Sequence, residues 1–161
     1  MATRRELKPF ASFDAVVADA DALHSGGYER AGMWTLAQAC GHLASWLDYQ
    51  RHGFPPLPFW LKPIFFALRN TMATGMLRKA ITTGTMAAGS STAPQSIPAP
   101  TVDDASELGR LKSAYRAWDA YTGPLVPSPL FGEHTRDDWR KLHLVHAAHH
   151  LSFLIPNPTR S

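Results

Sequence analysis

Residues 135–155 read TRDDWRKLHLVHAAHHLSFLI, and this stretch decides the fold that the sequence predicts. Thr135 is a typical helix N-cap, and Asp138 follows three residues later, where the acidic partner of a capping box stands. Pro156 cannot continue a helix, because it has no backbone N–H to donate. The pattern predicts a long helix from Thr135 to about Ile155. Four of the eight histidines of the chain lie inside it.

Four more helical stretches are predicted, and no strand pattern separates them. Apolar residues spaced three and four apart mark residues 12–24, 34–52 and 103–122 as amphipathic helices. Residues 59–83 are apolar on all sides, which favours a deeply buried helix with Pro63 in its first turn or at a kink. Residues 84–100 are rich in proline and small residues and predict a long irregular connection. Long helices without strands are typical of an antiparallel helical bundle, so the predicted fold class is all-α.

The chain has 161 residues, of which 45% are hydrophobic and 18% are charged. This length suits one domain with a core of its own, so we expect a single domain over residues 1–161. Sixteen Lys and Arg against thirteen Asp and Glu give a net charge of +3. The basic residues are scattered, whereas a nucleic-acid-binding protein concentrates them in a patch or stripe. We therefore expect no nucleic-acid partner.

Export and membrane insertion are not expected from this sequence. Cys40 is the one cysteine, which excludes an internal disulfide and a cysteine-based zinc site. Arg4 and Arg5 resemble the start of a twin-arginine signal, but aspartates interrupt the apolar stretch that such a signal requires. The most apolar segment, residues 54–68, is broken by prolines and a lysine and is too short to cross a membrane. We expect a cytoplasmic protein without stable membrane insertion.

The histidines of the last predicted helix form the main candidate site. Each residue of an α-helix turns by about 100°, so His146 and His150 project from the same side, about 40° apart. Two imidazoles at this spacing can ligate one divalent metal ion and need a third ligand from elsewhere. His42 is the leading candidate, because it lies on the apolar face of another predicted helix. The alternative is that all three are hydrogen-bonded core histidines without a metal.

Two segments resemble a known superfamily. Residues 32–44, GMWTLAQACGHLA, resemble the Trp-Ser/Thr…His-Leu helix of the DinB-like superfamily. Residues 139–154, which contain HAAHHLSF, are similar to the closing His-x-x-x-His helix of the same superfamily. More narrowly, REL at 5–7, FAS at 10–12, LFG at 130–132 and the HHLSF ending resemble one of its domain-of-unknown-function families. The resemblance covers nearly the whole chain.

This resemblance implies a four-helix bundle of the up-down-down-up type, with a long loop between the third and fourth helices. It also implies a metal site made of His42, His146 and His150, the same residues that the helical spacing selects. The superfamily includes metal-dependent transferases that use low-molecular-weight thiols, maleylpyruvate-isomerase-like members and many proposed hydrolases. Members often carry glutamine three residues after the last ligand, whereas this chain has Phe153 there.

Three neutral imidazoles leave at least one coordination position of a divalent ion open, as in catalytic sites. Zinc and nickel both suit such ligands. Gln38 and Trp46 lie one helical turn before and after His42 and could border the site, with core packing as the alternative for Trp46. His143, one turn before His146, is a candidate for supporting a ligand or moving a proton, or for helix packing alone.

No catalytic base is assigned from the sequence. Asp48, Glu133 and Asp138 are explained as well by surface or capping positions, and none lies on the expected ligand face. His149 is expected to face away from the site. His24, His52 and His134 lie near predicted helix ends or loops and need no function.

The sequence supports three hypotheses about function. The leading one is a metal-dependent thiol transferase or hydrolase that acts on a small molecule, with a low-molecular-weight thiol as co-substrate. A bound divalent ion adds positive charge to the core, which favours an anionic or thiolate substrate. The second hypothesis is a non-catalytic binding module on the same fold, and the third is a bundle that binds a membrane surface or a partner through residues 54–66. The sequence leaves a homodimer open.

Overall fold

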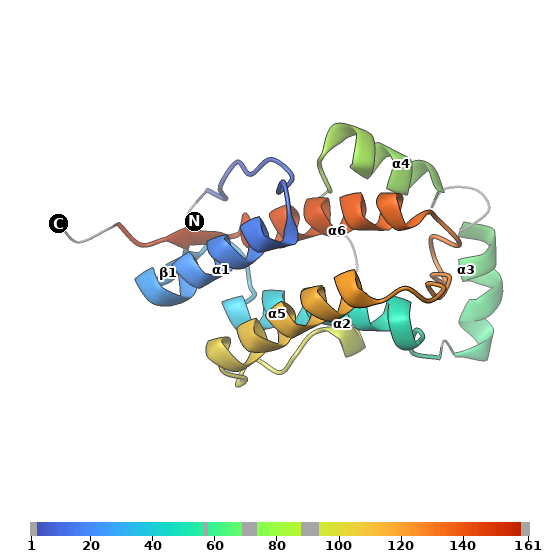
Figure 1. Cartoon of the computed structure of the whole chain (residues 1–161), viewed down its shortest axis with the longest axis horizontal. Helices are drawn as coiled ribbons and strands as arrows, with labels where there is room; N and C mark the ends of the chain where they lie inside the picture. Colours follow the sequence, from blue (N-terminus) through green and yellow to red (C-terminus); the bar gives the residue numbers. More distant parts are fainter. Residues whose placement is uncertain (1–2, 57, 69–73, 88–93, 159–161) are drawn as a thin grey trace.

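The computed structural model describes residues 3–56, 58–68, 74–87 and 94–158. Its four longest helices lie side by side (Figure 1). They are α1 (Phe13–Gly26), α2 (Leu36–His52), α5 (Asp104–Ala120) and α6 (Arg136–Leu151). The described part of the chain is mostly helical, in agreement with the all-α prediction.

Side-chain caps explain where the four helices begin. Each is preceded by a residue in extended conformation whose side-chain oxygen accepts a hydrogen bond from a backbone N–H of the first turn. These N-caps are Ser12, Thr35, Asp103 and Thr135. At α2 the cap is reciprocal, because Gln38 also accepts a hydrogen bond from the backbone N–H of Thr35, at 3.1 Å. The second helix therefore begins at Leu36, two residues after the predicted start.

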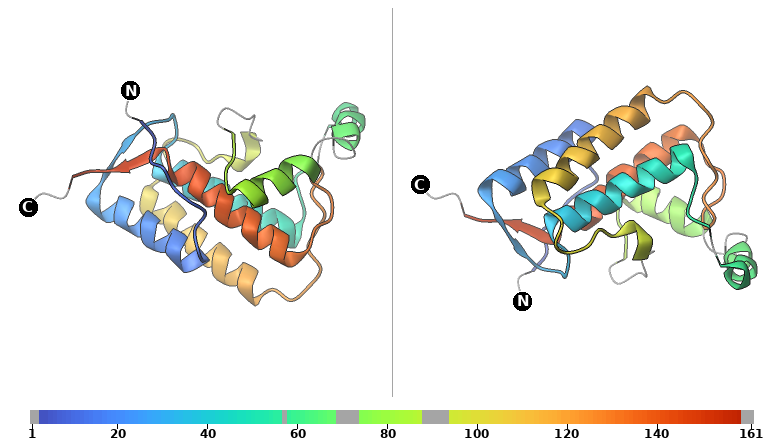
Figure 2. Two further views of the ribbon diagram at one scale, coloured as in Figure 1. Left: turned by 90° about the horizontal axis from the view of Figure 1, so that it is seen from above. Right: turned by 90° about the horizontal axis from the view of Figure 1, so that it is seen from below.

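The four helices enclose one shared hydrophobic core (Figure 2). Its large side chains come from every one of them and are excluded from solvent because they interdigitate between the helices. The largest fully buried apolar side chains are Trp118, Trp139, Leu23, Leu36, Leu43, Leu47, Leu77, Leu111, Leu151 and Leu154. This core fixes the spacing between α2 and α6, on which the candidate site depends.

Two short strands correct the prediction of a strand-free chain. β1 (Tyr28–Arg30) pairs antiparallel with β2 (Leu154–Pro156). The last helix therefore ends at Leu151 and not near Ile155. The reason is tertiary: the backbone after α6 finds hydrogen-bond partners in β1 and in Ala31, whose N–H donates to the Phe153 carbonyl at 2.8 Å.

The predicted single helix over residues 59–83 is also wrong. The described parts of this stretch are a 3₁₀ turn (Phe59–Leu61), α3 (Lys62–Leu68) and α4 (Thr74–Thr83), and residues 69–73 lie outside the described part. Pro63 lies in the first turn of α3, as predicted. Deep burial is not observed, because the four long helices already fill the core. Leu77 and Ala80 are buried where α4 packs along α6, whereas most described side chains of residues 59–67 are exposed.

The predicted irregular connection lies between α4 and α5. It contains a short 3₁₀ turn, Pro94–Ser96, and its residues 88–93 lie outside the described part. This turn lies against α2. None of the helices in the described ranges is long and apolar enough to span a bilayer.

Candidate metal centre

Three histidines from two helices meet between α2 and α6. His42 lies in the middle of α2, and His146 and His150 lie one turn apart on α6. Nε2 of His146 lies 3.1 Å from Nε2 of His42 and 2.9 Å from Nε2 of His150. Within the described part of the chain, these three side chains can each offer one nitrogen to a common ion, and the three atoms lie within 4.8 Å of one another. The structure thus brings together the three histidines that the sequence analysis selected as candidate ligands.

Burial keeps the three imidazoles neutral. His42 is only 1% exposed, and burial lowers its pKa to about 4. The pKa values of His146 and His150 lie well below the ordinary histidine value, first because of burial and then because each has histidine neighbours. At neutral pH all three rings are therefore unprotonated and can offer a lone pair to a metal ion.

Ser96 decides which nitrogen of His42 carries the proton. Its hydroxyl oxygen lies 2.8 Å from Nδ1 of His42, and the ring also makes a hydrogen bond to the Ser96 backbone that raises the pKa. A backbone group that raises a histidine pKa is an accepting carbonyl, which favours the tautomer with the proton on Nδ1. Nε2 is then left with a lone pair directed at the other two histidines. In metal sites, a ligating histidine normally donates the N–H of its other ring nitrogen to an acceptor in this way.

The segment that carries Ser96 is fastened to α2 on both sides of His42. The Gln38 side chain donates to the Pro98 carbonyl at 3.3 Å, and the Tyr49 hydroxyl donates to the Gln95 carbonyl at 3.3 Å. Gly41 makes the close approach possible, because a Cβ at this position would collide with the Pro98 ring. We call residues 95–98 the Ser96 strap.

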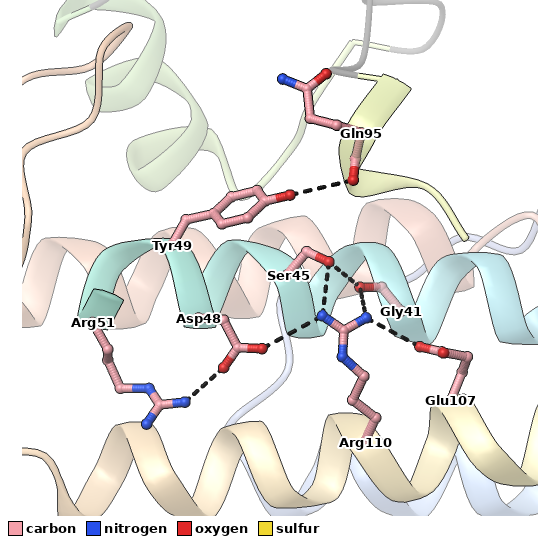
Figure 3. A network of polar contacts seen from close by, with 8 residues as sticks. All are labelled: Gly41, Ser45, Asp48, Tyr49, Arg51, Gln95, Glu107 and Arg110. Carbon is pink, nitrogen blue, oxygen red and sulfur yellow. Dashed lines mark hydrogen bonds and ion pairs between the residues drawn. The ribbon is translucent and has the colours of Figure 1, made fainter. Parts of the chain in front are cut away.

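Arg110 of α5 ties the two helices together at the level of His42 (Figure 3). Its guanidinium donates to the Gly41 carbonyl at 3.3 Å and to the Ser45 hydroxyl at 3.0 Å. It also forms ion pairs with Asp48 and Glu107, at 3.4 and 3.3 Å. Arginine can serve four acceptors at once because its donors are fixed in one plane. The network holds the two turns of α2 on either side of His42 in place.

Aromatic rings line the histidine cluster. Trp34 stacks on His150, with ring centroids 4.8 Å apart and an angle of 6° between the planes. Trp46 meets His42 and His146 edge-on, at 6.3 and 6.0 Å. The two indoles fix the orientation of the imidazoles and exclude water from their sides. Trp46 thus borders the site, as the sequence analysis considered.

His143 and His149 are not among the three converging histidines, although the His149 ring meets that of His150 edge-on, with centroids 5.0 Å apart. Nε2 of His143 donates to the side-chain oxygen of Gln50 at 2.8 Å, and Trp118 donates to the same oxygen at 3.1 Å. Burial, and then the charge of Arg140, lower the pKa of His143 to about 3. His149 turns to the other side of α6, where it makes a hydrogen bond to the backbone of Met86. The contacts of His143 are those of a packing residue.

The carboxylates considered as bases have structural partners elsewhere. Asp48 pairs with Arg51 at 2.6 Å as well as with Arg110. Asp138 caps the start of α6, where its carboxylate accepts a hydrogen bond from Thr135 at 2.7 Å. Glu133 lines a separate cavity of about 390 Å³. Among the described residues, no carboxylate belongs to the histidine cluster.

The donor set of the cluster fits a divalent transition metal ion. Two nitrogens bound to zinc at about 2.0–2.1 Å lie about 3.3 Å apart at a tetrahedral angle and closer at a right angle. Two of the three observed separations, 3.1 and 2.9 Å, fall in this range, and all three atoms lie within 4.8 Å of one another. Without an ion, three neutral imidazoles would direct more lone pairs at one another than their protons can satisfy, which is costly in a buried place.

A cavity of about 320 Å³ opens on the other face of α6. It is lined by the N-terminal segment, the residues after α4 and α6 itself, and His149 belongs to its wall. Arg4 and Arg5 contribute positive charge, although Arg5 is held by Asp19 through two hydrogen bonds of 2.8 and 2.7 Å. Because His149 precedes His150 in α6, this cavity adjoins the turn that carries a candidate ligand.

Ser96 and Arg110 are the supporting residues that the sequence analysis missed. Ser96 lies in a stretch without helical periodicity, 54 residues after its partner in the chain. Arg110 carried one possible signal, because it lies on the predicted helix three residues after Glu107, a spacing that pairs side chains on one face. The sequence links neither Ser96 nor Arg110 to His42, because the contacts of both residues with α2 depend on the tertiary fold.

Comparison with known proteins gives one match. The sequence profile of a family described as a protein of unknown function (DUF1569) matches residues 1–157. No curated protein matches the chain, and no solved structure does.

Proposed function

The chain belongs to the DUF1569 family of proteins of unknown function, and from its clustered histidines we propose that it is a metal-dependent enzyme of the DinB-like superfamily. His42, His146 and His150 would hold one divalent transition metal ion, zinc or nickel. The reaction would be a transfer that involves a low-molecular-weight thiol, or a hydrolysis. The observation that carries this proposal is the convergence of three Nε2 atoms, with neighbouring nitrogens 3.1 and 2.9 Å apart.

The arrangement of the long helices supports the DinB-like assignment. In Figure 1 the colours advance in one direction along α1 and α6 and in the opposite direction along α2 and α5. This order of directions is that of an up-down-down-up bundle. Parallel neighbours need a long crossover connection, and the residues between α2 and α5, which include α3 and α4, provide one.

The residues around the site prepare the three ligands. When bound, a divalent ion offers an open coordination position and Lewis acidity. Burial keeps the imidazoles neutral, the Ser96 strap keeps the proton of His42 on Nδ1, and Trp34 holds the ring plane of His150. The chain therefore presents ligands that need little rearrangement before an ion binds.

The cavity on the other face of α6, which none of the three histidines lines, offers a place for a small anion separate from the proposed metal site. Arg4 is exposed at its wall and lies with its guanidinium 5.5 Å from the ring centre of Phe153. Arg5 is neutralised by Asp19, and Glu6 adds a carboxylate to the same lining, so Arg4 is the lining cation left to bind an anionic group there. Phe153, in the place where the superfamily often has glutamine, would contribute an apolar surface to that end of the site.

Elemental analysis tests the metal site. The protein is purified without a histidine tag, stripped with a chelator and reconstituted separately with Zn²⁺ and Ni²⁺. We expect about one equivalent of metal in the unmutated chain and less than about a tenth in His146→Ala. His52→Ala, a change at an exposed residue at the end of α2, is the matched control and should retain the metal. Failure of the unmutated chain to take up either ion would overturn the proposal.

A non-catalytic metal-binding module is the second candidate. It is favoured by the lack of a carboxylate in the histidine cluster among the described residues. Assays of thiol transfer and of ester and amide hydrolysis on the reconstituted protein separate the two candidates. Turnover that disappears in His146→Ala supports the enzyme. Binding of a small anion without turnover in any assay supports the module.

A further inference from the structure

A group of large apolar side chains is exposed on the 3₁₀ turn and α3. Phe59 is 82% exposed, Trp60 61%, Ile64 51% and Phe66 68%. Scattered single apolar residues are normal on a protein surface, whereas four large exposed apolar side chains within eight residues make this segment unusually apolar for a surface. We call these four residues the α3 patch.

The chain around the α3 patch carries positive charge only. Residues 49–102 contain five of the sixteen Lys and Arg and none of the thirteen Asp and Glu. This third of the chain therefore carries +5, and the remainder of the chain carries −2. Of these basic residues, Arg78 and Lys79 of α4 are exposed, whereas Arg51 is paired with Asp48 at 2.6 Å; we call residues 49–102 the basic region of the chain. The net charge of +3 thus conceals a strong division between two parts of the molecule.

The α3 patch lies at an extreme end of the molecule. In both views of Figure 2, α3 projects beyond the ends of the long helices, and Figure 1 places it opposite β1. It is connected to the bundle through Phe54, which packs on Trp46 with ring centroids 5.8 Å apart. A surface at this position can approach a flat partner without steric hindrance from the rest of the bundle.

The charge of this region identifies the occupant of the patch. A second copy of the chain would bring one basic region against another in a twofold interface, and the like charges would oppose association. An anionic lipid surface offers the opposite charge together with an apolar layer beneath the headgroups. Phe, Trp and Ile side chains flanked by Lys and Arg are the combination that binds at such an interface.

We propose that the α3 patch docks the protein reversibly on an anionic membrane surface. The patch inserts at the level of the headgroups, and the basic region binds the negative surface potential of the lipid. The attachment is peripheral, which agrees with the finding on helix length in the described ranges. Neither contact involves the three histidines, so the proposal is independent of the metal site.

Vesicle flotation tests the proposal with the full-length protein. The vesicles are phosphatidylcholine alone, or phosphatidylcholine with about 30 mol % phosphatidylglycerol. We expect the protein to float with the anionic vesicles, and the bound fraction to fall at high salt, because the electrostatic part is screened. Phe59→Ser combined with Trp60→Ser should weaken binding at least about tenfold, since both apolar contacts are lost. Met33→Ser, at an 87% exposed apolar residue outside the region, is the control and should bind normally.

A charge-matched pair of variants tests the electrostatic part. Arg78→Glu with Lys79→Glu should also weaken binding to anionic vesicles about tenfold or more. Arg30→Glu with Arg116→Glu makes the same change in net charge at exposed residues outside the basic region and should bind more strongly than the first pair. Equal loss in both pairs would show a non-specific charge effect and contradict the proposal.

Two further outcomes would overturn the proposal. One is the absence of flotation with anionic vesicles. The other is a dimer in sedimentation equilibrium that dissociates in the Phe59→Ser, Trp60→Ser variant, which would assign the patch to a second copy of the chain. Both measurements are made on protein with and without metal, so a failure of the metal proposal leaves them interpretable.

Discussion

The hydroxyl oxygen of Ser96 lies 2.8 Å from Nδ1 of His42, although 54 residues separate them in the chain. His42 faces His146 with its other nitrogen, Nε2, at 3.1 Å. The long connection before α5 therefore takes part in the site, because it sets the proton position on one candidate ligand. Loops of this length in compact domains usually have such a role.

Ser96→Ala should lower metal affinity while the fold persists. The backbone carbonyl of Ser96 remains as an acceptor. We therefore expect the metal affinity to fall only about tenfold, the smallest effect usually seen when a residue that supports a metal ligand is changed. Competition with a chromophoric chelator measures the dissociation constant for Zn²⁺. Ser113→Ala removes a hydroxyl that serves only its own helix, by donating to the Gly109 carbonyl, and should leave the affinity unchanged. Equal affinity of the Ser96 variant and the unmutated protein would contradict a role for the strap.

Gly41→Ala should destabilise the fold and weaken metal binding together. The new Cβ would collide with the Pro98 ring and the Glu107 carboxylate, so the Ser96 strap must move away from α2. Overpacking of this kind costs about 1–3 kcal/mol in the free energy of unfolding.

Gly109→Ala is the matched control for this change. A Cβ at Gly109 meets nothing within 4 Å, and alanine favours a helix over glycine by about 0.5–1 kcal/mol. Urea unfolding in the presence of a chelator should therefore show opposite signs for the two variants. Destabilisation by Gly41→Ala without any change in zinc affinity would separate the strap from the site.

Trp34 should report occupancy of the site by its fluorescence. Its indole stacks on His150 at 4.8 Å, so a bound Cu²⁺ ion, which imidazole sites hold strongly, lies close enough to quench it. We expect titration with Cu²⁺ to quench part of the protein fluorescence and Trp34→Phe to remove part of that quench. Trp60→Phe, in the exposed α3 patch, should leave the quenched intensity unchanged. The reverse pattern would place the ion elsewhere.

The buried His143 should make stability fall with acid. Its folded pKa is about 3, lowered by burial and then by Arg140, whereas an unfolded histidine has a pKa near about 6.5. Above pH 6.5 neither state binds a proton at this residue, so its contribution is complete there. As pH falls from 6.5 towards 3, the unfolded chain takes up a proton that the folded chain does not. Stability then falls by about 1.4 kcal/mol per pH unit on account of this group.

His143→Gln tests this contribution, because glutamine can still donate to the Gln50 oxygen. Urea unfolding of the metal-free proteins at a series of pH values should give a shallower dependence for the variant below pH 6.5. Between pH 7.5 and 8.5 the two proteins should show the same dependence, which is the internal control. Parallel curves over the whole acid range would show that His143 takes up its proton equally in both states.

The local elements of this protein follow from short-range patterns. The starts of α1, α5 and α6 are set by N-cap residues that bond within their own first turn, and the sequence shows them directly. The pairing of His146 with His150 needs only the geometry of one helix. These features are predictable because both partners lie within four residues of each other.

The errors fall where a distant segment competes with local preference. Residues 152–155 continue the helical pattern of α6, but β1 takes their backbone into a sheet. The apolar stretch after Phe59 has the composition of a core helix, but among its described residues only Leu77 and Ala80 are buried in the core that the four long helices build. Composition predicts what a segment can bury, and the space left by other segments decides whether it does.

The sequence by itself determined the helical class, the starts of α1, α5 and α6 and the two histidines one turn apart on α6, because these depend on spacing within a single helix. It also indicated His42 through its apolar face and its motif. Only the tertiary structure decided that His42 reaches His146, that Ser96 holds the outer nitrogen of His42, and that the α3 patch faces solvent. Each of these depends on how separate segments share the space around one core, which no local pattern encodes.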